Sequence, residues 1–217
     1  MSAKRRVETM AENRAKLIAA ARKAFAAQGY AAASMDALTA EAGLTRGALY
    51  HNFGDKRGLL AAVVDQIDGE MAARAQAVGA AAGGGAGVGA GVGAGAGAAS
   101  ADDAWRGLLA EGAAYIEMAL DPEVQRIVLL DGPAVLGDPS HWPSQDSCLK
   151  RTRQAVERLI ASGLLKPVDA EAAARLLTGA ALNAALWIAA SDDPRAVLPK
   201  AVEAFRALAE GLLSEPT

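Results

Sequence analysis

The sequence contains few of the residues that build disulfides, metal sites and membrane spans. Among 217 residues it has one cysteine, Cys148, and two histidines. A single cysteine cannot form an intramolecular disulfide, and two histidines without ligand partners at suitable spacing predict no metal site. Residues 1–10 lack the apolar run of a signal peptide, and outside a Gly/Ala tract no stretch of about 20 apolar residues is uninterrupted. We therefore expect a cytoplasmic protein with no membrane partner and no cofactor.

Basic residues are concentrated at the amino-terminal end of a chain whose formal net charge is -3. Residues 1–58 carry ten Lys and Arg against five Asp and Glu, whereas residues 59–217 carry a net charge of -8. Because Lys and Arg supply most non-specific nucleic-acid affinity by neutralising phosphates, this asymmetry indicates that only the first segment meets a polyanion. Ordinary fluctuation of charge along a chain can also produce it.

The hydrophobic pattern is helical, and the alternating β-branched runs typical of strands are absent. Apolar residues recur three and four positions apart, which predicts an all-α fold of about nine helices. The predicted helices span residues 8–28, 34–42, 45–54, 55–78, 102–120, 122–136, 143–162, 169–190 and 194–213. Gly29 is placed to end the first helix in a left-handed conformation, and Pro133 should kink or interrupt the sixth.

From Gly79 to Ala99 every residue is Gly, Ala or Val, and ten of these twenty-one residues are glycines. Backbone entropy should prevent a stable helix through most of this tract, so we predict a loop over residues 79–99. The tract contains neither of the common glycine motifs that hold phosphates.

The segment from Ser34 to Phe53 has the parts of a helix-turn-helix: two short helices, a tight turn at Gly43, and small residues where the helices cross. Four apolar residues are spaced to bury against the first and fourth helices, namely Leu38, Leu44, Leu49 and Phe53. The opposite face of the second short helix is then free, and it presents Thr45, Arg46, Ala48, Tyr50, His51 and Asn52. This mixture of donors, an aromatic ring and a small apolar residue suits base edges and phosphates in a major groove.

Residues 43–56, Gly-Leu-Thr-Arg-Gly-Ala-Leu-Tyr-His-Asn-Phe-Gly-Asp-Lys, resemble the motif of the TetR/AcrR family of bacterial repressors. The resemblance covers about residues 14–64, including the Gly29-Tyr30 helix end and the Ser34-Met35 cap. It implies a sequence-specific DNA-binding transcriptional regulator that is not an enzyme, and a repressor released from its operator by a small-molecule effector. It also implies two domains: residues 1–58 form the three-helix DNA-binding domain, and residues 59–217 form a helical effector-binding and dimerisation domain.

Carried over position by position, the resemblance assigns roles to eight residues of the helix-turn-helix. Thr45, Arg46 and Ala48 would face bases. Phosphates would be held by Tyr50, His51 and Lys56. Ser34 and Met35, at the start of the second helix, would lie against the DNA backbone. Asn52 and Gly54 depart from the residues common in the family, which leaves the operator sequence open.

Two long amphipathic helices at the carboxyl-terminal end can pair with their copies in a homodimer, as the last two helices do in the family. The predicted interface residues are Leu176, Ala180, Ala184, Leu198, Val202 and Phe205. An intramolecular hairpin is the alternative. A partly apolar effector would occupy a pocket lined by aromatic, apolar and polar residues, for which the candidates are Trp105, Tyr115, Met118, Leu129, Trp142, Asn183 and Trp187. Such residues are also frequent in ordinary cores.

Two other kinds of protein compete with a regulator. An enzyme could use an acid/base or metal cluster of Asp131, Asp138, His141 and Asp146, but the sequence has no metal-binding pair, nucleophile elbow or cofactor loop to support it. A purely structural helical scaffold would explain the second half of the chain. It would leave the exposed pattern from Thr45 to Lys56 without a role.

Overall fold

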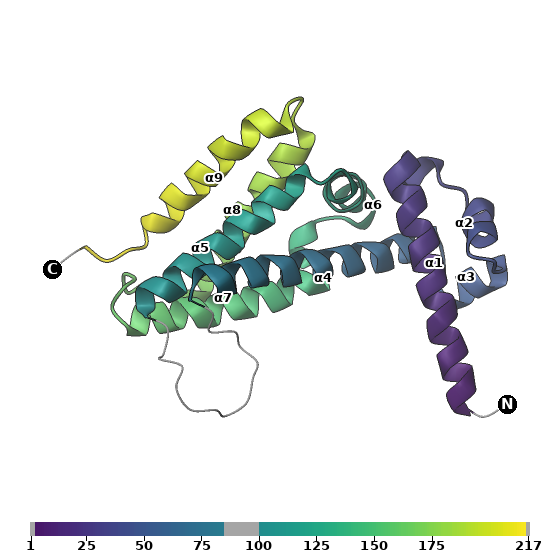
Figure 1. Ribbon diagram of the computed structural model, residues 1–217, viewed down its shortest axis with the longest axis horizontal. Helices are drawn as coiled ribbons and strands as arrows, with labels where there is room; N and C mark the ends of the chain where they lie inside the picture. Colours follow the sequence, from purple (N-terminus) through teal and green to yellow (C-terminus); the bar gives the residue numbers. More distant parts are fainter. Residues whose placement is uncertain (1–2, 85–99, 216–217) are drawn as a thin grey trace. The chain divides into compact units, whose positions relative to one another are not determined.

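Helices make up most of the residues that the computed structural model describes, which are 3–84 and 100–215 (Figure 1). The α-helices are α1 (Ala3–Ala32), α2 (Met35–Glu41), α3 (Arg46–Phe53), α4 (Lys56–Ala82), α5 (Ala101–Glu117), α6 (Gly132–Leu136), α7 (Pro143–Ala161), α8 (Ala170–Ala190) and α9 (Pro194–Glu210). The other helical elements are the 3-10 turns η1 (Met118–Leu120) and η3 (Pro139–His141) and the π-helix η2 (Val124–Asp131). One isolated bridge joins Leu165 to Leu213. The predicted all-α class is confirmed.

Two predicted helix boundaries differ from the structure near Gly29 and Pro133. Gly29 interrupts α1 with φ 78° and ψ 164°, a region that only glycine adopts readily, and the helix then resumes as far as Ala32. The Arg126 guanidinium occupies the place that a side chain at this position would take. Pro133 lies in the first turn of α6, and the change of helix geometry falls in the π-helix η2, which runs directly into α6.

The predicted loop over residues 79–99 begins later than expected, because α4 continues through Gly79 to Ala82. The glycines here serve close packing against α5. A Cβ on Gly107 would lie 2.9 Å from the Gly79 carbonyl oxygen, and a Cβ on Gly79 would lie 2.8 Å from that of Gly107. The contact between the two backbones offsets the low helix propensity of glycine. The rest of the predicted loop, residues 85–99, lies outside the described residues.

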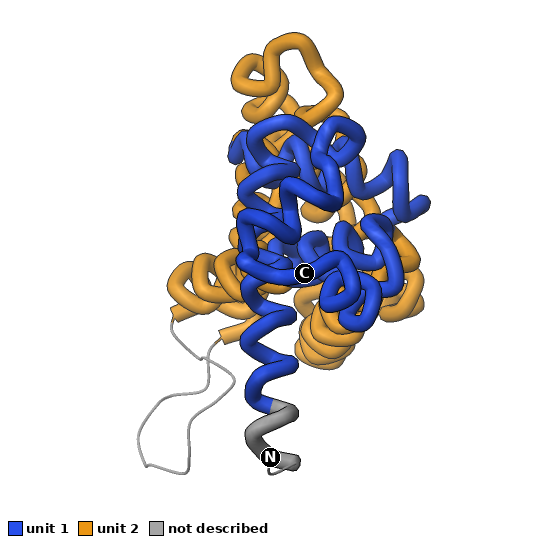
Figure 2. The backbone as a smooth tube through the Cα atoms, turned by 90° about the vertical axis from the view of Figure 1, so that its right-hand side faces the viewer, with its two compact units in different colours: residues 1–68, 121–139 blue, residues 69–120, 140–217 orange. Residues whose placement is uncertain are grey.

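The chain divides into two compact units (Figure 2). Unit 1 contains residues 1–68 and 121–139. Its core is formed by fully buried side chains from α1 to α4, among them Leu17, Phe25, Leu38, Leu49 and Leu60. Burial of such side chains is worth about 1.5–3 kcal/mol each, so these contacts fix how the short helices pack on α1.

Segment 121–139 is fastened to the rest of unit 1 at three points. Arg22 donates from Nε and Nη2 to the two carboxylate oxygens of Glu123, each at 2.7 Å. The Tyr30 backbone N–H donates to the Asp131 carboxylate at 2.7 Å. Arg57 donates to the backbone oxygens of Val135 and Leu136, at 3.2 and 3.4 Å. The second half of α1, which contains Arg22 and Tyr30, and the start of α4 thus hold a segment that is distant in the sequence.

Unit 2 contains residues 69–120 and 140–217, and its helices α5, α7, α8 and α9 pack around one apolar cluster. The buried members of this cluster are Trp105, Val156, Leu159, Leu165, Ala173 and Ala209. The isolated bridge and the hydrogen bond from Lys166 N to Leu212 O at 2.9 Å fasten the end of the chain to the loop before α8.

The two units do not coincide with the predicted domains at every residue. Residues 59–68 and 121–139 belong to unit 1, although both were assigned to the second predicted domain. A compact unit is not by itself a segment that folds independently, so the boundary between residues 58 and 59 stays a prediction.

Candidate nucleic-acid interface

Side-chain caps and one turn define the helix-turn-helix. The Ser34 hydroxyl oxygen accepts from Ala37 N at 3.1 Å at the start of α2, and the Thr45 hydroxyl oxygen accepts from Ala48 N at 3.2 Å at the start of α3. Between the helices, Gly43 has φ 64°, a conformation that glycine adopts without strain. The Leu44 N–H donates to Thr39 O at 2.9 Å, which closes the turn. Both predicted caps and the turn glycine are confirmed.

One face of α3 is anchored in unit 1. Leu49 is fully buried, and Leu38 of α2 is only 1% exposed. Phe53 is half-buried, and the Arg14 guanidinium carbon lies 4.7 Å from the centre of its ring. Because α3 is only two turns long, these contacts determine its orientation, and its opposite face must point to solvent.

The exposed face of α3 carries most of the residues predicted for it. Thr45, Arg46 and His51 are exposed, and Tyr50 is 52% exposed. Ala48 is half-buried. Asn52 is also half-buried, and its amide nitrogen donates to Ala48 O within the same helix at 2.8 Å. Its N–H donors are therefore partly engaged inside α3.

The remaining predicted contact residues lie at the starts of α2 and α4. Ser34 is exposed and Met35 half-buried. The Lys56 ammonium donates to Ala31 O at 3.3 Å and lies 4.4 Å from the centre of the Tyr30 ring. Burial lowers the pKa of Lys56 below its usual value, because it disfavours the charged form. Lys56 thus joins the start of α4 to the end of α1, and a phosphate would have to share its ammonium with these partners.

Arg46 forms an ion pair that the sequence pattern did not predict. Its Nε and Nη2 donate to the two carboxylate oxygens of Asp36, in the first turn of α2. This bidentate hydrogen bond holds the pKa of Asp36 below its usual range. The two residues are ten positions apart on different helices, so no helical spacing rule relates them. Only the packing of α2 on α3 reveals the pair.

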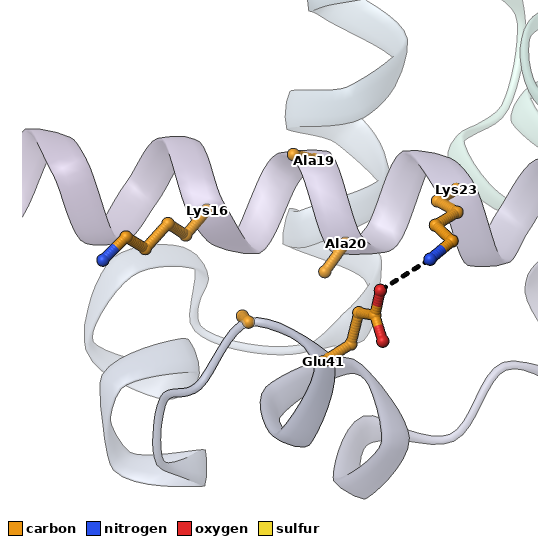
Figure 3. A pocket seen from close by; sticks show the side chains of 6 residues that line it. Lys16, Ala19, Ala20, Lys23 and Glu41 are labelled. Atoms are coloured by element: carbon orange, nitrogen blue, oxygen red, sulfur yellow. Dashed lines mark hydrogen bonds and ion pairs between the residues drawn. The ribbon is translucent and has the colours of Figure 1, made fainter.

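A second ion pair lines a surface hollow between α1 and α2 (Figure 3). The Lys23 ammonium donates to the Glu41 carboxylate at 2.7 Å, and both side chains are largely exposed. The other lining residues are Lys16, Ala19, Ala20 and Ala42. None of the residues predicted for the effector pocket lines this hollow.

The predicted effector-pocket residues are divided between the two units. Leu129 is buried in unit 1, whereas the other six belong to unit 2. Within unit 2, Trp105 and Met118 are buried and Tyr115 and Trp142 are half-buried. Asn183 and Trp187 are exposed on α8, and Trp187 is 51% exposed. The indole nitrogen of Trp142 is buried without a hydrogen-bond partner among the described residues.

The predicted dimer residues have three different environments. Leu176 is 74% exposed on α8, and four others are half-buried, namely Ala180, Ala184, Leu198 and Val202. Phe205 is only 4% exposed, and its ring fills the space beside Gly112 inside unit 2. Leu208 is not among the predicted interface residues, yet it is 69% exposed on α9. The eleven-residue spacing of Leu176 and Trp187, close to three helical turns, could have revealed an exposed apolar stripe on α8.

The residues of the competing enzyme hypothesis do not form a metal site. Among residues 3–84 and 100–215, no group of three or more His, Cys, Asp and Glu side chains could hold a metal ion. The Asp131 carboxylate instead accepts from Tyr30 N, and lies 3.6 Å from Arg126 Nε. By length and composition α8 is apolar enough to cross a membrane; 39% of its apolar window is buried, and the helix packs against α5, α7 and α9.

Comparison with known proteins places the chain in a family. Residues 17–63 match the model of the bacterial regulatory proteins of the tetR family, and residues 105–212 match the tetracyclin repressor-like C-terminal domain. A TetR-family transcriptional regulator from Pectobacterium atrosepticum is 46% identical with a TM-score of 0.80, covering 97% of this chain and 98% of its own. The chain therefore belongs to the TetR family, whose members are DNA-binding transcriptional regulators.

More distant structures share the fold. A TetR-family regulator from Mesorhizobium loti is 20% identical with a TM-score of 0.58, covering 92% of this chain and 97% of its own. RolR in complex with resorcinol is 16% identical with a TM-score of 0.63, covering 97% of this chain and all of its own. A search of curated proteins finds no match.

The hydroxyl of Thr45 caps α3, so substitutions at this position measure what the cap contributes to stability. We expect Thr45→Ala to lower the free energy of unfolding by about 1 kcal/mol, because the first turn of α3 loses its acceptor. Thr45→Ser keeps the hydroxyl and should keep most of this stability. Urea denaturation followed by circular dichroism measures both. Equal stability of the two variants would show that the cap contributes nothing.

Proposed function

We propose that this regulator is a cytoplasmic, homodimeric repressor that binds a double-stranded operator and leaves it when a small, partly apolar effector binds. The observation that carries the DNA-binding part is the face of α3. Thr45, Arg46, Tyr50 and His51 are exposed on a short helix whose other face is anchored by Leu49. A rigid helix with a polar, cationic outer face is the element that enters a major groove in helix-turn-helix proteins.

Within this proposal the exposed residues divide by the DNA groups that they reach. Arg46, Thr45 and Ala48 lie in the first turn of α3 or at its cap, and the start of a recognition helix is the part that contacts base edges. Tyr50 and His51 lie one turn later and would donate to phosphates, together with Lys56. Ser34 and Met35 at the start of α2 would contact the backbone of the DNA, with Ser34 retaining its cap to Ala37 N.

We propose α8 and α9 as the dimer interface. Leu176 and Leu208 are the two most exposed large apolar side chains of these helices, and Trp187 adds to them; exposed apolar surface marks a protein–protein contact where it forms a contiguous patch. Ala180, Ala184, Leu198 and Val202 would extend the contact. Trp187 fits this surface better than a pocket, because half of it is exposed. Two copies of α3 are needed to span half-sites about one DNA turn apart.

Release by an effector requires coupling between the two units, and the chain itself provides three connections. It passes from one unit to the other at residues 68/69, 120/121 and 139/140. The first crossing lies inside α4, and the other two flank segment 121–139, which the Arg22–Glu123 ion pair holds to α1. An effector that favours one arrangement of unit 2 can therefore bias unit 1 by shifting a two-state equilibrium.

Four of the predicted pocket residues remain candidates for effector binding: Trp105, Tyr115, Met118 and Trp142. The unpartnered indole N–H of Trp142 is the strongest support, since a buried donor without an acceptor costs free energy that a ligand can recover. RolR, a protein of the same fold, binds resorcinol, which shows that this fold can hold a small aromatic molecule.

Selection from a pool of random duplexes tests the DNA-binding proposal. We expect one preferred sequence composed of two related half-sites, with an affinity that falls steeply as salt rises because phosphate contacts release counterions.

Tyr50→Ala should weaken binding by about 1 kcal/mol or more on every duplex through the loss of a phosphate hydrogen bond. Tyr50→Phe, which keeps the ring, separates the hydroxyl from the ring. Placing the selected duplex upstream of a reporter gene should lower transcription. Selection that enriches no sequence contradicts the proposal.

The oligomeric state tests the proposed interface. Leu176→Arg places a charge on the exposed face of α8 and should convert the dimer to a monomer in light scattering at micromolar concentration, because an unpaired buried charge is strongly unfavourable. Val78→Arg is the matched control, since Val78 is also an exposed apolar residue of unit 2, at 43%, but lies on α4. Dissociation by both variants, or by neither, would argue against α8 as the contact surface.

Effector release is tested by linkage. Small aromatic and apolar compounds that raise the melting temperature of the free protein are titrated onto the protein alone and onto its complex with the selected duplex. Each should bind the complex more weakly, and the duplex should in turn bind the loaded protein more weakly by the same factor. Trp142→Phe should weaken compound binding, whereas Trp187→Phe should not. Equal affinity of every such compound for both forms is the result that would rule out release.

A further inference from the structure

Arg46 occupies an electrostatically unfavourable position, which its partner Asp36 compensates. It is the first residue of α3, where the unsatisfied backbone N–H groups give the helix a partial positive charge. A cation at this end is disfavoured unless an anion compensates it. Asp36 supplies the anion, and both side chains remain exposed, at 58% for Arg46 and 69% for Asp36.

The hydrogen-bond pattern leaves one edge of the Arg46 guanidinium available. Asp36 takes the edge formed by Nε and Nη2. A guanidinium has five N–H donors in a planar fork, so the Nη1 group and the second N–H of Nη2 still point away from the carboxylate. One N–H of Nη1 and the second N–H of Nη2 are parallel, and they match the O6 and N7 acceptors that guanine presents in the major groove.

We propose that Asp36 is a positioning residue for DNA recognition, and this inference rests on the proposed function. Its carboxylate holds the Arg46 guanidinium with the free edge turned outward, ready for a guanine. It also neutralises much of the Arg46 charge, so that Arg46 adds little to the attraction of arbitrary DNA. Asp36 therefore raises the preference for operator over other DNA without contacting a base.

Two physical effects follow from this arrangement. Arginine loses several rotatable bonds when it binds a base, and a partner that fixes the side chain beforehand removes part of that entropy cost. The directional bidentate contact is kept, whereas the attraction of Arg46 to phosphates, which acts on any sequence, is reduced. Both effects increase discrimination between sequences, and neither requires the ion pair to stabilise the fold.

Asp36→Asn tests this inference, and Glu41→Gln is its matched control. Both substitutions remove one exposed carboxylate of α2 that is paired with a cation, but Glu41 pairs with Lys23 of α1 (Figure 3). The probes are the duplex selected by the wild-type protein and a duplex of the same length with scrambled sequence. Asp36→Asn should bind the scrambled duplex more tightly, with a steeper salt dependence, and its preference for the selected duplex should fall about tenfold. Glu41→Gln should change binding to both duplexes alike, leaving the preference within about twofold.

A second readout identifies the base that Arg46 contacts. Duplexes in which each guanine of a half-site is replaced in turn are titrated with wild-type protein, Arg46→Ala and Asp36→Ala. Replacing the guanine that Arg46 contacts should no longer weaken binding by Arg46→Ala. The same replacement should weaken binding by Asp36→Ala less than it weakens binding by the wild-type protein. Urea denaturation should give closely similar stability for wild type and both Asp36 variants, so that loss of preference cannot come from unfolding.

The outcomes separate this inference from the proposed function. Failure of the wild-type protein to select any sequence removes the proposed function and the inference with it. Selection followed by an unchanged preference in Asp36→Asn and Asp36→Ala overturns the role of Asp36 alone. A fall in preference that Glu41→Gln reproduces also overturns it, because the effect would then be one of net charge.

Discussion

The burial of Leu38 and Leu49 against α1 is the constraint on which the interface depends. Two fully or almost fully buried leucines on two short helices leave those helices little freedom to rotate. Neither α2 nor α3 is long enough to be stable by itself in water, so tertiary packing determines both their existence and their orientation. The exposed position of Arg46, Tyr50 and His51 follows from this burial, as does the approach of Asp36 to Arg46.

The same unit contains a segment from a distant part of the sequence. Residues 121–139 are held by Arg22, by the Tyr30 backbone and by Arg57, so ion-pairing and backbone acceptors fasten them to α1 and α4. The segment begins and ends at connections to unit 2. Under the proposed release mechanism, a change of packing in unit 2 reaches α3 along the chain, and the π-helix η2 lies between the two crossings.

The sequence predicted the helix-turn-helix closely because its determinants are local. Caps at Ser34 and Thr45, a turn at Gly43 and apolar residues at helical spacing all depend on neighbours within a few positions. These local rules do not predict contacts between segments that are distant in the sequence. The Asp36–Arg46 pair, the attachment of Glu123 to Arg22 and the burial of Phe205 beside Gly112 each depend on how helices pack. The helical course of Gly79 to Ala82 was missed for the same reason, since close packing on α5 outweighs low helix propensity there.

In the proposed complex, α3 enters the major groove with Arg46 held by Asp36. The most direct measurement is a crystal structure of the full chain bound to its selected duplex. We expect the first turn of α3 in the major groove, the free edge of the Arg46 guanidinium within hydrogen-bond distance of a guanine, and the Asp36 carboxylate still on the opposite edge. A complex in which α3 lies outside the groove, with Arg46 directed away from the bases, would contradict the account.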